Sequence, residues 1–276
     1  MTVPATGPTS LEALDLAIGY GRRRVAGGIS LAIRQGEVYC LLGPNGCGKT
    51  TLFRTLLGLI PPLSGSVRLA GRDLAGRSRR SLARLMAYVP QSHAPAFSFA
   101  VREVVLMGRT AHLGLFSQPG RADHRQVEAA LAQLGIADLA DSDYSRLSGG
   151  QRQLVLIARA LAGECLFMVM DEPTASLDYG NQALVLDRIR QLAAGGIGVV
   201  MSSHDPDHVL AVGHRAALMR DGAILRAGPI DEVMDSSTLG RVYGMAVDVM
   251  VLPDGRKVCL PGRPADCPAP VPPVLT

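Results

Sequence analysis

Residues 38 to 52 read VYCLLGPNGCGKTTL, and this stretch decides the fold class. The apolar run 38–42 is typical of a strand buried on both faces of a parallel sheet. The next eight residues match the pattern G-x-x-x-x-G-K-[ST], in which glycines turn backbone N–H groups inward as a nest for phosphate oxygens. A helical stripe of Leu52, Leu56 and Leu59 follows, with its positive end toward the nest. The stretch therefore predicts a strand, a phosphate-binding loop and a helix in an α/β core.

The same loop predicts which side chains touch the phosphates and a metal. Lys49 is one of only two lysines in a chain whose other basic residues are all arginine, and it supplies a compact charge for the β and γ phosphates. Thr50 supplies a hydroxyl for Mg²⁺. A nucleoside triphosphate with Mg²⁺ is the expected ligand.

Composition excludes several classes of protein. The 276 residues are 47% hydrophobic, which argues against disorder, and the net charge of +4 is too small to predict nucleic acid binding. No apolar run approaches 18 residues and the start resembles no export signal, so we expect a cytosolic protein, soluble or docked to a partner. Five cysteines without a C-x-x-C pair predict neither disulfides nor zinc, and we expect buried thiols.

Further patterns extend the α/β core. Apolar runs at 166–170 and 197–201 predict two more buried strands, and stripes at 154–161 and 185–192 predict helices. An antiparallel β layer is predicted by two further signals. Apolar residues alternate with other residues at 14–18 and 29–33, and a hairpin is expected around Asp221-Gly222. Between about 95 and 146 only helical spacing is found, at Val127, Leu131 and Leu134, which predicts an inserted helical subdomain. The proline-rich residues 261–276 are expected to form a disordered or extended tail.

Two carboxylates follow the predicted strand at 166–170. Asp171 and Glu172 would lie at the carboxyl end of that strand, where α/β sheets bind ligands. Helix capping alone would explain such a pair, but a phosphate-binding loop in the same chain favours a catalytic reading. We expect Asp171 to hold Mg²⁺ through water and Glu172 to orient and deprotonate the attacking water.

Leu147-Ser148-Gly149-Gly150-Gln151 resembles the signature motif of the ABC-type ATPases. The resemblance covers nearly the whole chain, and its parts occur in the family's order. It implies a P-loop NTPase fold of the ABC ATPase type, with a mixed core sheet, an antiparallel β layer and the inserted helical subdomain. It places one ATPase domain at 11–260.

The resemblance also implies roles for further residues. Tyr20 resembles the aromatic residue that stacks on adenine, Gln91 the glutamine that touches Mg²⁺ and the attacking water, and His204 the switch histidine near the γ-phosphate. By position alone, core packing for Tyr20 and a structural role for His204 are the alternatives. The resemblance implies catalytic roles for Glu172, His204, Gln91 and Lys49, and metal contacts from Thr50, Gln91 and Asp171. The implied ATP contacts are Tyr20, Gly43, Pro44, Asn45, Gly46, Cys47, Gly48, Lys49, Thr50, Thr51, Ser148, Gly149, Gly150, Gln151 and Asp178.

Ser148 to Gln151 open a predicted helix and so form a second anion site. The resemblance to ABC-type ATPases implies a head-to-tail homodimer, in which each signature motif closes over the partner's phosphate-binding loop. One cassette without a membrane span implies a separate membrane permease, and indirectly a periplasmic binding protein. The resemblance thus implies a peripheral ATPase at the cytoplasmic face of the inner membrane, with no nucleic acid partner.

Residues 101–109 with 112–114, and Val242-Tyr243-Gly244, resemble the ATPase subunits of iron-chelate (siderophore), haem and cobalamin importers. Molybdate or tungstate importers share these features, so the cargo stays open, and a soluble ABC ATPase without transport is the rival function. The stretch 91–109 is expected to face the permease, although Arg102 and Arg109 would also suit a solvated surface. We further hypothesise that the phosphate nest lowers the pKa of the Cys47 thiol.

Overall fold

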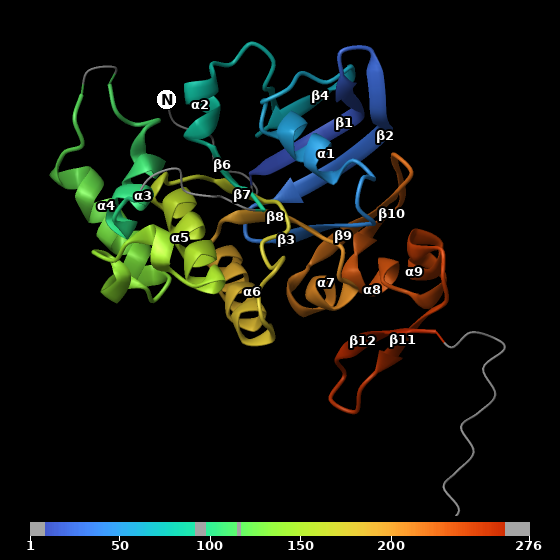
Figure 1. Ribbon diagram of the computed structural model, residues 1–276. Helices are drawn as coiled ribbons and strands as arrows, with labels where there is room; N and C mark the ends of the chain where they lie inside the picture. The colour runs from blue at the N-terminus through green and yellow to red at the C-terminus, as the bar shows by residue number, and fades with distance from the viewer. Residues whose placement is uncertain (1–8, 92–97, 115–116, 263–276) are drawn as a thin grey trace, which may run out of the picture.

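The computed structural model describes residues 9–91, 98–114 and 117–262 (Figure 1). The strands are β1 (Ser10–Tyr20), β2 (Arg23–Arg34), β3 (Val38–Leu42), β4 (Ser64–Leu69), β5 (Arg72–Asp73), β6 (Met86–Val89), β7 (Phe167–Met170), β8 (Gly198–Ser203), β9 (Arg215–Arg220), β10 (Ala223–Pro229), β11 (Val247–Val251) and β12 (Lys257–Pro261). The helices are α1 (Lys49–Leu56), α2 (Arg79–Ala83), α3 (Val101–Leu106), α4 (Arg121–Gln133), α5 (Gly149–Ala162), α6 (Tyr179–Ala194), α7 (Pro206–Val212), α8 (Ile230–Val233) and α9 (Ser236–Tyr243). Three short 3₁₀ turns lie at η1 (Met107–Arg109), η2 (Ala137–Leu139) and η3 (Tyr144–Arg146).

A six-stranded sheet in the order β10-β9-β3-β8-β7-β6 forms the centre of the fold. Strands β9, β3, β8, β7 and β6 run parallel, and only β10 is antiparallel to its neighbour. The register pairs Leu42 with Ser203 and Val89 with Met170. The carboxyl ends of β3, β6, β7 and β8 therefore meet along one edge, where ligands bind in sheets of this kind.

The central sheet is buried on both faces, as the alternation within β3 demonstrates. Val38, Cys40 and Leu42 face a core shared with α5, α6 and α7. Tyr39 and Leu41 face a second core, shared with α1 and the four-stranded antiparallel sheet β2-β1-β4-β5. Figure 1 shows that antiparallel sheet on one side of the central strands, with α6 and α7 on the other. Burial on both faces explains the continuous apolar runs of the central strands.

The sequence patterns located most elements of this core. The predicted buried strands, the helices around 154–161 and 185–192, the alternating strands and the hairpin at Asp221-Gly222 are confirmed. The assignment of that hairpin to the antiparallel layer was wrong, because β9 pairs with β3 and places the hairpin at the edge of the central sheet. The extension of the first helix to Leu59 was wrong. Helix α1 ends at Leu56, Gly58 takes a left-handed φ of 68°, and the Leu59 side chain is 46% exposed. A glycine in that conformation ends a helix readily, so the apolar spacing ran past the true end.

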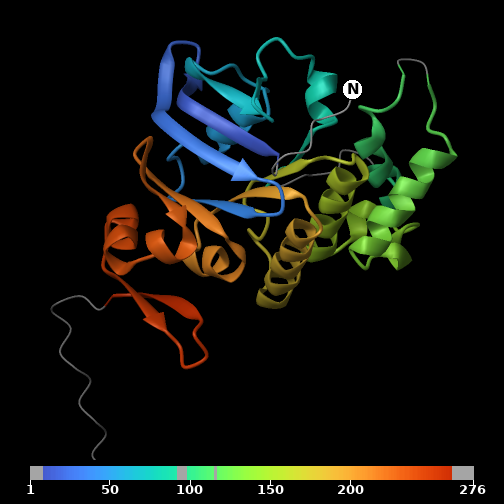
Figure 2. The same ribbon diagram turned by 180° about the vertical axis from the view of Figure 1, so that it is seen from behind.

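The described residues between 98 and 146 form α3, η1, α4, η2 and η3, and there the only strand-like pairing is an isolated bridge between Ala100 and Asp143. Both α3 and α4 pack against α5, and Figure 2 shows them at the opposite end of the molecule from α9.

Arg109 holds this helical part together instead of facing solvent. Its guanidinium is buried, donates to Asp123 Oδ1 at 2.9 Å and to the carbonyl of Ala162 at 2.9 Å, and pairs with Glu164. Arg109 thus ties η1 to the start of α4 and the end of α5. Both readings of Arg109 from the sequence, a permease contact and a solvated surface, are wrong because internal carboxylates satisfy its charge.

Beyond the central sheet the chain adds α8, α9 and the hairpin β11–β12. Pro261, expected to begin a tail without structure, ends β12 and pairs with Val247. The rest of the predicted tail, 263–276, lies outside the described residues. None of the helices in the described part of the chain is both long and apolar enough to cross a membrane.

Candidate nucleotide-binding site

The loop between β3 and α1 forms a cradle around the Lys49 ammonium. Lys49 Nζ donates to the carbonyl of Gly43 at 2.7 Å and to the carbonyl of Pro44 at 3.3 Å. Gly48 has a φ of 111° where α1 begins, a conformation that a side chain would strain. A Cβ on Gly43 would lie 2.3 Å from the carbonyl oxygen of Met219. The glycines of the motif are therefore required by this backbone path and by the close approach of β9.

Asp171, at the end of β7, connects three neighbouring elements. Its Oδ2 accepts a hydrogen bond from Thr50 Oγ1 at 2.7 Å and a longer one from Tyr88 at 3.4 Å. Its Oδ1 accepts from Ser202 Oγ at 2.7 Å, and the same hydroxyl accepts from the backbone N–H of Glu172 at 2.8 Å. The adjacent ends of β3, β6, β7 and β8 thus bring a threonine hydroxyl against a buried carboxylate.

Glu172 is the point where the predicted catalytic side chains converge. Its carboxylate lies 3.5 Å from Lys49 Nζ, accepts from Gln91 Nε2 at 3.2 Å and lies 3.3 Å from His204 Nδ1. The residue is 9% exposed and has a φ of 46°, a conformation that residues other than glycine rarely take. Strain of this kind often accompanies functional sites. Three residues from separate segments of the sequence therefore meet at the Glu172 carboxylate.

A pocket of about 240 Å³ opens over these groups. It is lined by Val25, Asn45, Gly46, Gly48, Lys49, Thr50, Thr51, Gln91, Asp171 and Glu172. All but Val25 were expected from the sequence to contact ATP, Mg²⁺ or the attacking water. The pocket brings the phosphate-binding loop and the two carboxylates into one polar cavity.

Tyr20 stands at the margin of this site, at the end of β1. Its ring is 46% exposed, and its hydroxyl accepts a hydrogen bond from Arg54 Nη1 at 3.1 Å. A hydrogen bond with Thr51 is the main cause that lowers the pKa of Tyr20. Because Thr51 lines the pocket and Tyr20 does not, the partly exposed ring lies beside the cavity.

The signature residues lie away from the pocket. Ser148 caps α5: its Oγ accepts from the N–H of Gln151 at 3.2 Å, and Gln151 Oε1 accepts from the N–H of Ser148 at 3.0 Å. A Cβ on Gly150 would lie 2.1 Å from Asn181 Oδ1, and Asp178 in turn accepts from the N–H of Asn181 at 2.9 Å. None of these residues lines the pocket. They form a second cluster at the N-terminal ends of α5 and α6.

Cys47 does not behave as the sequence suggested. Its side chain is 5% exposed, and it packs beside Gly43 without lining the pocket. Burial raises the pKa of the Cys47 thiol and outweighs the lowering effect of the Lys49 charge. The expected lowering of this pKa was wrong because the thiol packs into the buried core cluster that α1 shares with the antiparallel sheet, where a charged thiolate is disfavoured. The other described cysteines, Cys40, Cys165 and Cys259, are buried and free as expected.

Sequence reasoning missed three residues of this site. Ser202 bridges Asp171 and Glu172, Tyr88 reaches Asp171, and Val25 lines the pocket. A serine within the buried strand β8 was a usable signal, since a fully buried hydroxyl needs a hydrogen-bond partner. No local pattern marks Val25, because it reaches the pocket only through the packing of β2.

The donor set suits magnesium. Thr50 offers a hydroxyl, Asp171 a carboxylate and Gln91 an amide oxygen, and Mg²⁺ prefers such oxygen ligands, with phosphates and water completing its shell. Among the residues that the structure describes, no group of three or more His, Cys, Asp or Glu side chains could hold a metal alone.

Comparisons with known proteins agree with this geometry. Residues 26–175 match the family model described as ABC transporter. The chain is 39% identical to an ABC transporter ATP-binding protein of Haemophilus influenzae over 87% of this chain and 91% of the relative. It is also 39% identical to a hemin import ATP-binding protein of Streptomyces coelicolor, over 94% and 92%.

Among solved structures, the chain superposes on an inward-facing ABC transporter assigned to the metal-chelate type. The TM-score is 0.82 at 29% identity, and the match covers 93% of this chain and 98% of the other. The fold thus agrees with both kinds of comparison. The chain belongs to the ABC transporter family, as one of its ATP-binding chains.

Proposed function

We propose that this chain is the ATP-hydrolysing subunit of a bacterial ABC importer, and that it powers uptake of a metal chelate through a separate membrane permease. The observation that carries the proposal is the convergence of Lys49, Gln91 and His204 on the Glu172 carboxylate, beside Thr50 and Asp171. The reaction is ATP plus water to ADP and phosphate.

Lys49 links ATP binding to the release of the catalytic carboxylate. Its ammonium shares its charge between the carbonyls of the loop and Glu172. A γ-phosphate carries more negative charge than a carboxylate and would compete for the same ammonium. Binding of ATP would therefore loosen Glu172 from Lys49 and leave its oxygens available to accept a proton.

Glu172 would act as the general base. As water attacks the γ-phosphorus, one proton passes to a Glu172 oxygen and the bond from the γ-phosphorus to the bridging oxygen of ADP breaks. Gln91 and His204 already contact Glu172 Oε2, so they are placed to orient the water and the base. Burial of Glu172 excludes competing bulk water from this step.

Thr50, Asp171 and Gln91 would hold Mg²⁺ together with the phosphates. The ion would supply charge neutralisation for the β and γ phosphates. Ser202 fixes Asp171 Oδ1 and leaves Oδ2 turned toward Thr50, so the carboxylate is oriented before any ion arrives.

Two copies would be needed to complete each site. The signature cluster of Ser148, Gly150 and Gln151 caps α5 outside the pocket, so within one chain it has no access to the phosphates. A head-to-tail homodimer would place this helix N-terminus over the partner's pocket, where the amides suit an anion. Tyr20, whose side chain is partly exposed beside the pocket, would stack on the adenine.

A groove on the outer surface is the candidate docking site for the membrane permease. It measures about 320 Å³ and lies between α2 and β6 on one side and η1 and α5 on the other. Met107 and Leu59 lie at its surface, 44% and 46% exposed, and Arg79 and Arg159 add positive charge. A short cytoplasmic helix of the permease with an apolar face and an acidic residue would fit this groove. The chain would then be peripheral to the cytoplasmic face of the inner membrane.

The cargo is proposed from relatives, because cargo contacts the permease and binding protein and not this chain. Both the hemin import relative and the metal-chelate type structure support a metal chelate such as haem, an iron siderophore or cobalamin. Uptake of labelled haem, siderophore, cobalamin or molybdate by cells with and without this gene would separate the cargoes.

The deciding experiment on the ATPase is the substitution Glu172→Gln. We expect release of phosphate to stop while ATP and Mg²⁺ still drive a monomer to a dimer in light-scattering measurements. Asp187→Asn, a change on α6 at a half-exposed side chain that does not line the pocket, is the matched control and should hydrolyse ATP normally. Hydrolysis by the Glu172→Gln variant at the parent rate would refute the base assignment.

The groove is tested separately. Met107→Glu should reduce copurification with the co-expressed permease, because it puts an uncompensated charge on the apolar surface. Met250→Glu, at a position equally exposed on the hairpin β11–β12, should copurify like the parent. Equal recovery of the permease with all three proteins would exclude this groove as the docking site.

A further inference from the structure

The backbone of His204, the predicted switch histidine, accepts a hydrogen bond from a residue near the C-terminal end of the described chain. The hydroxyl of Tyr243, the last residue of α9, donates a hydrogen bond to the main-chain carbonyl of His204 at 2.8 Å. We propose that Tyr243 is a positioning residue for ATP hydrolysis and that it sets where the His204 imidazole stands relative to Glu172. The inference rests on the proposed ATPase function and adds to it a role for the C-terminal segment.

His204 needs such support because its side chain is little constrained by packing. The imidazole is 56% exposed, and its Nδ1 lies 3.3 Å from Glu172 Oε2. An exposed side chain keeps its place mainly through the backbone that carries it. Ser203 fixes one side of that backbone, since its carbonyl accepts from the N–H of Gly43 at 3.4 Å and its Oγ accepts from the N–H of Asp205 at 2.9 Å. Tyr243 fixes the other side.

Tyr243 is itself held by its own helix. Asp235 caps α9 by accepting from the N–H of Thr238 at 2.8 Å, and Leu239 and Val242 are buried in the core. Gly244 follows with a φ of 71°, and this left-handed turn ends the helix directly after Tyr243. The ring therefore projects from a fixed helix end toward residues 203–205, which carry His204 and are called the switch loop below.

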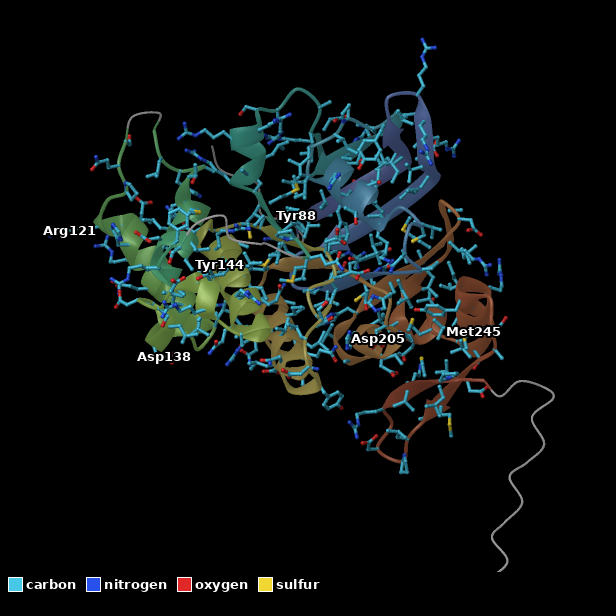
Figure 3. All side chains as sticks on the ribbon, in the orientation of Figure 1. Tyr88, Arg121, Asp138, Tyr144, Asp205 and Met245 are labelled. Carbon is cyan, nitrogen blue, oxygen red and sulfur yellow. The ribbon has the colours of Figure 1, made fainter. Side chains whose placement is uncertain are left out.

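A second contact joins the C-terminal segment to the helix that follows the switch loop. The N–H of Cys259, on β12, donates to Asp207 Oδ1 at 2.8 Å. Asp207 lies in the first turn of α7, and its own N–H donates to Asp205 Oδ1 at 2.8 Å. Figure 3 labels Asp205 beside α7 and Met245 just beyond α9, on neighbouring parts of the molecule. The switch loop is thus bonded to α9 directly, through Tyr243, and to the hairpin β11–β12 indirectly, through Asp207. Both α9 and the hairpin lie beyond the matched residues 26–175.

The phenol remains a hydrogen-bond donor throughout the neutral pH range. Burial raises the pKa of Tyr243, and the negative charge of Asp205 raises it further. The hydroxyl therefore keeps its proton, and the carbonyl of His204 keeps its donor. Removing that hydroxyl leaves the ring in its packing place but frees the His204 peptide to rotate, which moves the imidazole away from Glu172.

The test is a double-mutant cycle with Tyr243→Phe and His204→Ala in the full-length chain. Loss of one neutral hydrogen bond predicts that Tyr243→Phe lowers kcat about 2- to 10-fold, with KM for ATP unchanged. In the His204→Ala background the same change should have no further effect on the residual kcat, since the residue it positions is gone. Leu260→Ala, on the outer surface of β12, is the control and should keep the parental kcat.

A second measurement does not depend on turnover. In ¹³C-labelled protein, the His204 imidazole signal, assigned by its loss in His204→Ala, should shift in Tyr243→Phe and stay in place in Leu260→Ala. An unshifted signal, an unchanged kcat in Tyr243→Phe, or an equal loss of kcat in both backgrounds would overturn the inference. A parent chain that fails to hydrolyse ATP would refute the proposed ATPase instead, and the imidazole signal would still decide the role of Tyr243.

Discussion

Lys49 Nζ lies 3.5 Å from Glu172 Oε1, and both side chains are almost fully buried. The residue that would bind phosphate therefore pairs with the residue that would deprotonate water. Such a pair keeps both charges satisfied inside the protein, where an unpaired charge is costly. Exchange of the carboxylate for a phosphate at Lys49 would connect substrate binding to activation of the base.

This pairing predicts that Glu172→Gln binds ATP more tightly than the parent. The neutral amide competes less for Lys49 and repels the γ-phosphate less, so we expect Kd for Mg-ATP to fall by about 3- to 10-fold, equivalent to about 1 kcal/mol. Equilibrium binding of a fluorescent ATP analogue measures Kd, with Asp187→Asn as control. Equal or weaker binding by Glu172→Gln would show that Lys49 is not shared between the two anions.

Ser148 caps α5 away from the pocket, so its substitution should lower ATP turnover without changing ATP binding by one chain. Ser148→Ala should leave the affinity of one chain for ATP unchanged, because Ser148 does not line the pocket, while phosphate release falls sharply. Loss of the cap should also cost about 1 kcal/mol of stability. Ser78→Ala removes a similar cap from α2, where Ser78 Oγ accepts from the N–H of Ser81 at 3.2 Å, and should keep turnover. A parental rate of phosphate release in Ser148→Ala would count against composite sites.

Two neighbouring arginines predict different stability losses. Arg109→Ala should lower the free energy of unfolding by about 2 kcal/mol or more, because it removes a buried guanidinium that bonds to Asp123, Glu164 and the carbonyl of Ala162. Arg102 pairs with Asp141 at 2.6 Å, but the two side chains are 52% and 82% exposed, so Arg102→Ala should cost under about 1 kcal/mol. Urea denaturation followed by circular dichroism compares the two. Similar losses would mean that the Arg109 cluster contributes no more than a surface pair.

Burial of Cys47 predicts slow alkylation. Because burial raises its pKa, less thiolate is present near pH 8 than for an ordinary cysteine, and the rate should still be rising with pH above 9. Mass spectrometry of the tryptic peptide after timed treatment with iodoacetamide measures this rate, and Cys47→Ser identifies the peptide. Rapid alkylation at pH 7 would contradict the raised pKa.

The sequence indicated which segments come together at the candidate nucleotide site, because the parts of that site are local patterns. The motif at 43–50 and the acidic pair 171–172 each follow a buried strand, and parallel strands bring such ends together. Arg109 and Cys47 were misjudged for one reason: whether a charge is paired or a thiol is buried depends on segments far away in the chain. Asp123 and Glu164 neutralise Arg109, and no spacing within 101–109 indicates them.

The sequence by itself determined several strands and helices of the core, the phosphate-binding loop and the main polar side chains at the sheet edge. Periodicity and glycine placement are properties of short segments, so they can be read without the fold. Only the tertiary structure decided that Ser202 orients Asp171, that Tyr243 reaches the backbone of His204, and that the signature cluster lies outside the pocket. Each of these depends on packing between elements distant in sequence, because hydrogen bonds form only when such elements bring donor and acceptor within about 3 Å.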